Sequence, residues 1–255
     1  MIEFAHVTKS YPTGEVVLDD ISFVVAPGEF LVITGKSGVG KTTLGRLLIR
    51  DATPTSGQII IDGEDLTKIK DSKIPALRRK IGFVFQDYKI IPDKTVAENI
   101  TIALEIAQTP SKLIKEKIEK LLQVVGIPGK GNLFPIQLSG GELQRASIAR
   151  AIAADPPILF ADEPTGNLDK ETSLEIFELL RNINQAGTTI IMATHDVTLI
   201  EYHNARHIHL VDGKIVNDID NRIKPEVKET ETKTEEKITI KKKKTKKIKK
   251  KKQTN

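Results

Sequence analysis

Residues 30–51 read FLVITGKSGVGKTTLGRLLIRD, and this stretch decides the fold of the chain. It starts as a short apolar run, turns through Gly35, Gly38 and Gly40, and continues with leucines at helical spacing. We therefore expect a buried strand, a glycine-rich loop and a helix. The loop matches the pattern G-x-x-x-x-G-K-[ST], and a strand before it with a helix after it is the setting of a phosphate-binding P-loop.

The backbone of this loop is suited to binding phosphate groups. Glycine lets consecutive N–H groups turn inward toward β- and γ-phosphate oxygens, and the helix N-terminus adds a positive field. Lys41 can reach the same phosphates, and the hydroxyl of Thr42 can bind Mg²⁺. The residues expected at the nucleotide are Gly35, Ser37, Gly38, Val39, Gly40, Lys41, Thr42 and Thr43.

Strand and helix patterns alternate on both sides of the loop. Alternating apolar residues predict two strands within 1–25, and residues 95–154 have helical periodicity, with one helix over 110–125. Further elements are expected as strands at 57–63, 81–86, 157–162 and 188–196, a helix at 170–185 and a hairpin within 206–216. This order predicts an α/β fold with a parallel sheet core, an N-terminal antiparallel β subdomain and a helical subdomain at about 90–156.

Two adjacent carboxylates follow the apolar run at 157–162. Asp162 and Glu163 come at its C-terminal end, where alone they would be two solvated acids. Downstream of a phosphate-binding loop, the pair is suited to catalysis of phosphoryl transfer. We assign Mg²⁺ binding to Asp162 and polarisation of the attacking water to Glu163.

A third stretch, Leu138-Ser139-Gly140-Gly141-Glu142, opens the helix that precedes the acidic pair. A serine hydroxyl, glycine N–H groups and a helix N-terminus together form a second anion site. The stretch resembles the LSGGQ signature of the ATP-binding cassette (ABC) ATPases. Glu142 departs from the more frequent glutamine, and Thr42 from the commoner serine of the P-loop, but neither change removes a group that hydrolysis needs.

The remaining motifs of that family follow in order along residues 1 to about 220. By resemblance, Tyr11 stacks on adenine, Gln86 contacts Mg²⁺ and the attacking water, and His195 contacts the γ-phosphate; Asp169 ends the D-loop Gly166-Asn167-Leu168-Asp169. The resemblance thus implies a P-loop ABC cassette that hydrolyses ATP with Mg²⁺. Its catalytic residues would be Lys41, Gln86, Glu163 and His195, and its metal ligands Thr42, Gln86 and Asp162.

The family resemblance also implies an ATP site split between two subunits. One subunit contributes the P-loop, the acidic pair, Gln86 and His195, whereas its partner contributes Ser139, Gly140, Gly141 and its D-loop. We therefore expect a head-to-tail homodimer that closes on ATP and opens after hydrolysis. The intact Glu163 and His195 argue against a scaffold that binds ATP without hydrolysing it.

Smaller features resemble one subgroup of this family. The D-loop GNLD and the sequence MATHD at 192–196 resemble ATPases of lipoprotein release, macrolide-type efflux and cell division. Residues 1–11, 81–87 and 134–137 favour the cell-division type, which implies an FtsX-like integral membrane partner and regulation of cell-wall hydrolysis. A lipoprotein-release or macrolide-type exporter ATPase is the alternative. Residues 87–92 lie where family members contact a membrane partner, although a packed loop would fit the sequence equally.

Composition limits the cellular location and the kinds of site expected for this chain. The chain has no cysteine, which excludes a disulfide scaffold, a cysteine metal site and a catalytic thiol. It has no apolar run long enough to span a bilayer and no signal-peptide pattern at its N-terminus. We therefore expect a peripheral protein on the cytoplasmic face of the cell membrane.

The net charge of +5 combines two different regions. Residues 224–255 hold 14 lysines and 5 glutamates, whereas the rest of the chain holds 25 basic and 29 acidic residues. We expect an ABC ATPase domain at 1–222 and a disordered lysine-rich tail at 223–255. The tail fits a solvated, dispensable extension, a contact to anionic lipid or, less well, a contact to nucleic acid. A nucleic-acid-binding ABC protein is disfavoured, because about 96 residues between Lys41 and Gln137 are too few for a coiled-coil arm.

Overall fold

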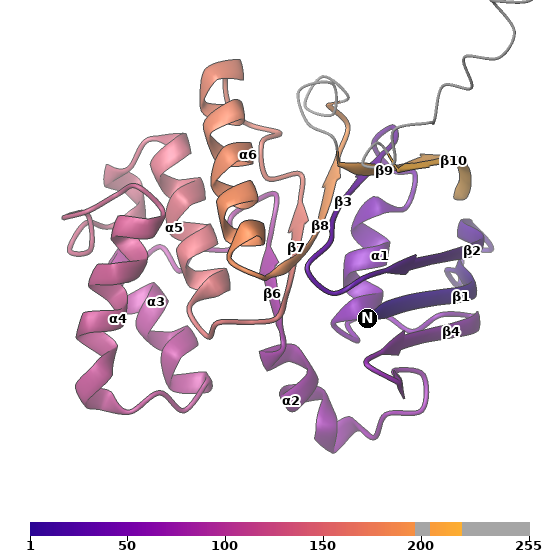
Figure 1. Cartoon of the computed structure of the whole chain (residues 1–255), viewed down its shortest axis with the longest axis horizontal. Coiled ribbons are helices and arrows are strands. Elements are labelled where there is room, and N and C mark those ends of the chain that lie inside the picture. Colours follow the sequence, from indigo (N-terminus) through magenta and orange to yellow (C-terminus); the bar gives the residue numbers. More distant parts are fainter. Residues whose placement is uncertain (197–204, 221–255) are drawn as a thin grey trace, which may run out of the picture. The chain divides into compact units, whose positions relative to one another are not determined.

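The computed structural model describes residues 1–196 and 205–220, and these residues build two sheets with helices between and beside them (Figure 1). Four strands form an antiparallel sheet in the order β2-β1-β4-β5. The strands are β1 (Ile2–Ser10), β2 (Val16–Val25), β4 (Ser56–Ile61) and β5 (Glu64–Asp65). The predicted N-terminal antiparallel β subdomain is confirmed.

A second sheet of six strands has the order β10-β9-β3-β8-β7-β6. All its neighbours pair in parallel except β10, which runs antiparallel to β9. Its strands are β3 (Phe30–Thr34), β6 (Ile81–Val84), β7 (Ile158–Asp162), β8 (Thr189–Thr194), β9 (Arg206–Val211) and β10 (Lys214–Asp220). The predicted parallel core and the terminal hairpin are therefore confirmed.

Strand β3 separates two hydrophobic cores, because successive side chains of a strand point to opposite faces. Leu31 and Ile33 join the core beneath the antiparallel sheet, which also contains the leucines of α1 (Lys41–Leu48). Phe30 and Val32 join the other core, where the remaining long helices pack. A continuous apolar run in the sequence thus becomes a strand buried on both sides, with all five residues buried.

Three helices form a group of their own beside the six-stranded sheet (Figure 1). These are α3 (Val96–Ile106), α4 (Ser111–Val124) and α5 (Gly140–Ile152), and all lie within the segment expected to be helical. Helix α6 (Lys170–Gln185) packs against α5 and β8. The elements that the sequence did not predict are the short ones: η1 (Asp71–Lys73), α2 (Ile74–Arg79), η2 (Pro135–Gln137) and β5. A six-residue helix spans less than two turns and leaves no periodic pattern to detect.

Within the part of the chain that the structure describes, no helix is long and apolar enough to cross a bilayer. The lysine-rich tail at 223–255 lies outside the described residues. Its disorder, and the boundary of the domain before it, therefore stay predictions.

Candidate active site

The loop between β3 and α1 wraps around the side chain of Lys41. Gly38 and Gly40 have φ of 82° and 107°, conformations that other residues rarely adopt. A Cβ at Gly40 would also lie 2.6 Å from Cδ2 of Leu18. Lys41 Nζ donates to the carbonyl oxygens of Gly35 and Lys36 at 2.7 and 3.0 Å. The ammonium group is thus held on the inner side of the loop, within reach of a phosphate bound there.

Strand order brings the catalytic candidates together. Strand β8 lies between β3 and β7 in the sheet, and Thr34 pairs with Thr194 while Asp162 pairs with Ala193. The carboxyl ends of these three parallel strands therefore meet at one edge of the sheet. Residues 35–41, 162–163 and 195 follow these ends directly, although up to 160 positions separate them in the sequence.

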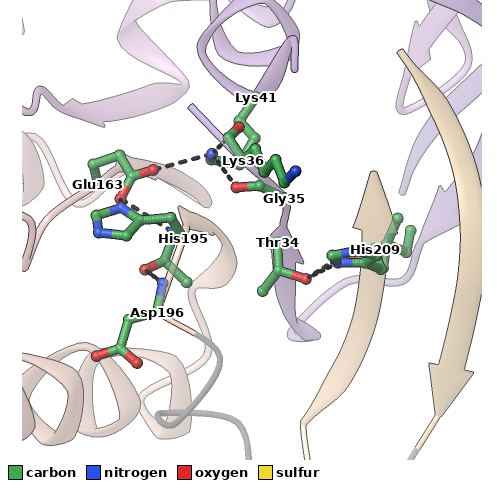
Figure 2. A network of polar contacts seen from close by, with 10 residues as sticks. Thr34, Gly35, Lys36, Lys41, Glu163, His195, Asp196 and His209 are labelled. Atoms are coloured by element: carbon green, nitrogen blue, oxygen red, sulfur yellow. Dashed lines mark hydrogen bonds and ion pairs between the residues drawn. The ribbon is translucent and has the colours of Figure 1, made fainter. Parts of the chain in front are cut away.

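Glu163 is the centre of the resulting polar network (Figure 2). Its Oε1 lies 3.1 Å from Lys41 Nζ, and its Oε2 lies 2.7 Å from Nδ1 of His195. The side chains of Lys41 and Glu163 are 5% and 8% exposed, whereas that of His195 is 54% exposed. The backbone of Glu163 has φ of 47°, and its N–H donates to Ala193 at 2.9 Å. Such strain is typical of functional sites, where the surrounding structure holds it in place.

Asp162, the neighbour of Glu163, has a buried carboxylate oxygen without a partner. Its Oδ1 accepts no hydrogen bond from any described residue, and the residue is 4% exposed. Burial raises the pKa of Asp162, and the negative charge of Glu163 adds to the rise. A hydrogen bond with Thr42 and the charge of Lys41 oppose it. An unsatisfied buried oxygen next to a hydroxyl fits a hard cation, because Mg²⁺ prefers oxygen ligands.

The residues at this edge do not form a closed metal cage. Among residues 1–196 and 205–220, no three His, Cys, Asp or Glu side chains cluster as a set of ligands. Mg²⁺ usually binds through one or two carboxylates while phosphates and waters complete its shell. Thr42 and Asp162 therefore fit a metal that arrives with a nucleotide.

Gln86 lies beyond the end of its strand. The sequence suggested that Gln86 ends the strand at 81–86, but β6 stops at Val84 because a turn begins there, with the N–H of Tyr88 donating to Phe85 at 3.1 Å. Gln86 is exposed, and its Nε2 lies 3.9 Å from where a Cβ at Gly166 would stand. It is thus placed next to the loop that follows Glu163.

The signature residues and Asp169 form a second cluster at two helix N-termini. Ser139 caps α5 by accepting from the N–H of Glu142 at 3.3 Å, and Asp169 caps α6 by accepting from that of Thr172 at 2.9 Å. A Cβ at Gly141 would lie 2.7 Å from Cγ2 of Thr172, so the two helix starts touch. Among the described residues, no hydrogen bond or ion pair joins this cluster to Glu163.

Tyr11 lies apart from both clusters. It starts the turn between β1 and β2, where its N–H donates to Glu15 at 3.0 Å and Nζ of Lys9 lies 5.1 Å from its ring. A cleft of about 590 Å³ beside the P-loop is lined by residues 15–17, 36–39 and 209–213, and Tyr11 is not among its lining residues. The contacts of the described residues therefore do not assign Tyr11 its role.

Comparison with known proteins decides the family. The model of the ABC transporter family matches residues 18–166. The chain belongs to the ABC transporter family. It is 47% identical over 218 residues to the cell division ATP-binding protein FtsE of Bacillus subtilis, covering 86% of this chain and 96% of that protein. It is also 44% identical to FtsE of Escherichia coli K12 over 215 residues, covering 84% of this chain and 97% of that protein.

Solved ABC cassettes share the fold. The cassette MJ0796, in a dimeric post-hydrolysis state bound to ADP and Pi, superposes with a TM-score of 0.79 and 33% identity, covering 87% of this chain and 99% of that one. These findings show that the chain is an ABC ATPase, which binds ATP and hydrolyses it. They confirm the resemblance that the sequence motifs indicated.

Two polar arrangements around the ABC site were not predicted from the sequence. The hydroxyl of Thr34, directly before the P-loop, lies 2.8 Å from Nε2 of His207 and 2.9 Å from Nδ1 of His209 (Figure 2 shows the contact with His209). Arg150 of α5 donates to the backbone that follows Gln86. Neither arrangement has a sequence signal, because only strand pairing and helix packing bring these residues together.

Proposed function

We propose that the chain is the ATPase subunit of an FtsE–FtsX-type complex in bacterial cell division. ATP hydrolysis would drive a conformational change in an FtsX-like integral membrane protein, at the cytoplasmic face of the membrane, and so regulate cell-wall hydrolysis. The FtsE relatives support this assignment, since they match nearly their whole length at 44–47% identity. An ATPase of a lipoprotein-release or macrolide-type exporter is the alternative.

The observation that carries hydrolysis is the placement of Glu163 between Lys41 and His195. Glu163 Oε2 is oriented by the ring of His195, so its carboxylate is held as a general base toward the P-loop. Lys41 can move its ammonium group from Oε1 of Glu163 to the phosphates, which would bind on the same side of the loop. Oε1 is then free to accept the proton of the attacking water.

Three residues would hold Mg²⁺ in this proposal: Thr42 through its hydroxyl, Asp162 through its unpartnered Oδ1, and Gln86 through its amide oxygen. Bound Mg²⁺ neutralises charge that develops on the β- and γ-phosphates. Gln86 is exposed and lies in the turn that follows β6, next to the loop after Glu163. Burial of Asp162 keeps its carboxylate oriented for the same purpose.

A homodimer would complete each ATP site. Ser139, Gly140, Gly141 and Asp169 lie together at the starts of α5 and α6, apart from the Glu163 network. The hydroxyl oxygen of Ser139 accepts from the N–H of Glu142. The hydroxyl proton of Ser139 is therefore available to donate to a phosphate of the ATP that the partner subunit binds. The dimeric state of the solved MJ0796 cassette supports the same arrangement.

The first test is Glu163→Gln in the full-length chain. Glutamine keeps the shape but cannot accept the proton, so we expect ATPase activity to fall by about a hundredfold or more. The variant should elute as a dimer in size-exclusion chromatography with ATP and Mg²⁺. Glu119→Gln, an exposed substitution on α4, is the control and should behave as the wild type. Normal hydrolysis by Glu163→Gln would refute the role of this residue.

A groove beside Gln86 is the candidate docking surface for the membrane partner. It has a volume of about 720 Å³, an apolar floor that includes Phe83 and Ile102, and a cationic rim that includes Arg79 and Lys89. The loop at 87–92 is itself packed: Ile91 is half-buried, and Asn99 binds its N–H and carbonyl at 2.8 and 3.1 Å. We therefore take the groove, with the exposed loop residue Lys89 at its rim, as the candidate surface.

The partner is identified by affinity capture from native membranes with the Glu163→Gln chain and ATP. Recovery of an FtsX-like protein with few membrane spans and a large extracytoplasmic domain supports the cell-division assignment. Recovery of a lipoprotein-release permease instead overturns that assignment and leaves the ATPase chemistry intact. We also propose that the lysine-rich tail contacts anionic lipid, since 10 of residues 241–252 are lysine.

A further inference from the structure

Two consecutive residues after Gln86 have an unusual backbone conformation. Tyr88 and Lys89 have φ of 60° and 48°, in the left-handed region that is costly for residues other than glycine. Lys89 Nζ also pairs with Asp87 at 2.7 Å across this turn. Two left-handed residues in succession persist only where neighbouring groups hold them.

Helix α5 supplies the groups that hold this turn. Arg150 donates to the carbonyl of Tyr88 at 3.0 Å through one terminal nitrogen and to that of Lys89 at 2.5 Å through the other. The hydroxyl of Ser147, one helical turn earlier, donates to the same Tyr88 oxygen at 3.2 Å. The turn is therefore fixed by three hydrogen bonds from one face of α5.

The described residues provide no ion-pair partner for the guanidinium of Arg150. Burial lowers the pKa of Arg150. A desolvated cation is costly unless it is hydrogen-bonded, and here each terminal nitrogen donates to a backbone carbonyl. The planar fork of arginine holds two neighbouring oxygens in one fixed geometry, which the rotatable ammonium of lysine on its flexible stem does not impose.

We propose that Arg150 is a positioning residue for ATP hydrolysis, because it sets the turn at 87–89 and thereby the place of Gln86. The inference rests on the role proposed above for Gln86. Tyr88 also lies near the start of α5, since its Oη is 3.9 Å from where a Cβ at Gly140 would stand. The helix that begins with the signature thus bonds to this turn near its last turn and lies close to it near its first.

The position of Arg150 also connects the turn to the groove. Arg150, Lys89 and Phe85 line the groove that is the candidate docking surface. A partner segment that draws the guanidinium toward itself would weaken its hold on the two carbonyls. The turn, and Gln86 with it, would then respond to what occupies the groove.

The test is Arg150→Lys in the full-length chain, which keeps the charge but not the fork. We expect kcat for ATP to fall about tenfold or more, because small misplacement of a catalytic group is costly, while KM changes less than about twofold. Arg78→Lys is the matched control. Arg78 also donates to two consecutive carbonyls, of Ile49 and Arg50, at 3.0 and 3.4 Å, beside a left-handed residue. It lines the same groove but does not hold the turn at 87–89, so it serves as the control when kcat is measured without a partner. Its kcat should stay at the wild-type value.

Two further measurements separate positioning from mere stability. In hydrogen exchange, a peptide covering 85–91 should exchange faster in Arg150→Lys than in the wild type or in Arg78→Lys. In a Gln86→Ala background, Arg150→Lys should cause no further loss of kcat, since both changes remove the same contribution. Unchanged exchange at 85–91, or an equal loss in the Gln86→Ala background, would overturn the proposal. A wild-type chain without ATPase activity contradicts the proposed function instead, and the exchange data still test the turn.

Discussion

At the scale of single residues, Asp162 lowers the stability of the folded chain at a position that the proposed chemistry requires. Its carboxylate is buried next to Glu163, and its Oδ1 has no partner in the described part of the chain. Burial of an unsatisfied charged group costs stability, and that cost appears as a raised pKa in the folded protein. The arrangement is advantageous only when a cation binds there.

We therefore expect Asp162→Asn to abolish ATPase activity but to raise the melting temperature in buffer without metal or nucleotide. The rise should be a few degrees, as for other sites where function and stability conflict. A raised folded pKa means that the penalty is fully present at pH 7 and disappears as pH falls through that pKa, so the gain should shrink as the pH is lowered into the acid range. Asp93→Asn, on an exposed loop, is the control and should change neither the ATPase activity nor the melting temperature. A lower melting temperature for Asp162→Asn at pH 7 would show that Asp162 is satisfied in the folded chain.

At the scale of elements, two helices begin with the same N-terminal capping motif. Ser139 and Glu142 form a capping box on α5, and Thr95 and Glu98 form one on α3. In each, the glutamate accepts from the N–H of the capping residue, and this hydrogen bond lowers the pKa of both carboxyls. The two boxes stabilise their helices alike, but only Ser139 belongs to the proposed ATP site.

Ser139→Ala and Thr95→Ala are therefore a matched pair. Each removes one cap and should lower the free energy of unfolding by about 1 kcal/mol in urea denaturation. Only Ser139→Ala should also lower kcat, because it removes a donor to the partner subunit's ATP. If both variants hydrolyse ATP at the wild-type rate, Ser139 acts only as a helix cap.

At the scale of the whole molecule, charge is divided along the chain. Residues 1–223 carry a net charge of −4 and residues 224–255 a net charge of +9. Each lysine near an anionic surface contributes about 1 kcal/mol to binding, so the lipid contact proposed for the tail would be strong enough to hold the chain on a membrane. The residues proposed for the ATP site, by contrast, all precede the tail.

Deletion of 224–255 should thus leave ATPase activity unchanged and weaken binding to vesicles that contain anionic lipid. A variant with the ten lysines of 241–252 replaced by glutamine keeps the length of the tail and should lose binding to the same extent. Vesicles of zwitterionic lipid are the control. Equal vesicle binding with and without the tail would refute a lipid role, and salt-sensitive binding of nucleic acid by the tail alone would assign it a different partner.

The sequence by itself determined the local elements and the family. The stretch at 30–51 predicted a strand, a loop and a helix because glycine conformations and hydrophobic periodicity act over a few residues. The motifs around Ser139, Asp162 and His195 could be assigned in order because each follows or opens a predicted element.

Only the tertiary structure decided which of these residues meet. Lys41, Glu163 and His195 become neighbours because β8 lies between β3 and β7, and strand order cannot be derived from local pattern. The left-handed turn at Tyr88 and Lys89 contains no glycine or asparagine, so the sequence does not predict it. It forms because Arg150, on a helix some 60 positions away, binds its carbonyls. Long-range packing, which compensates for local strain and for buried charge, is the physical reason that these features were not predicted.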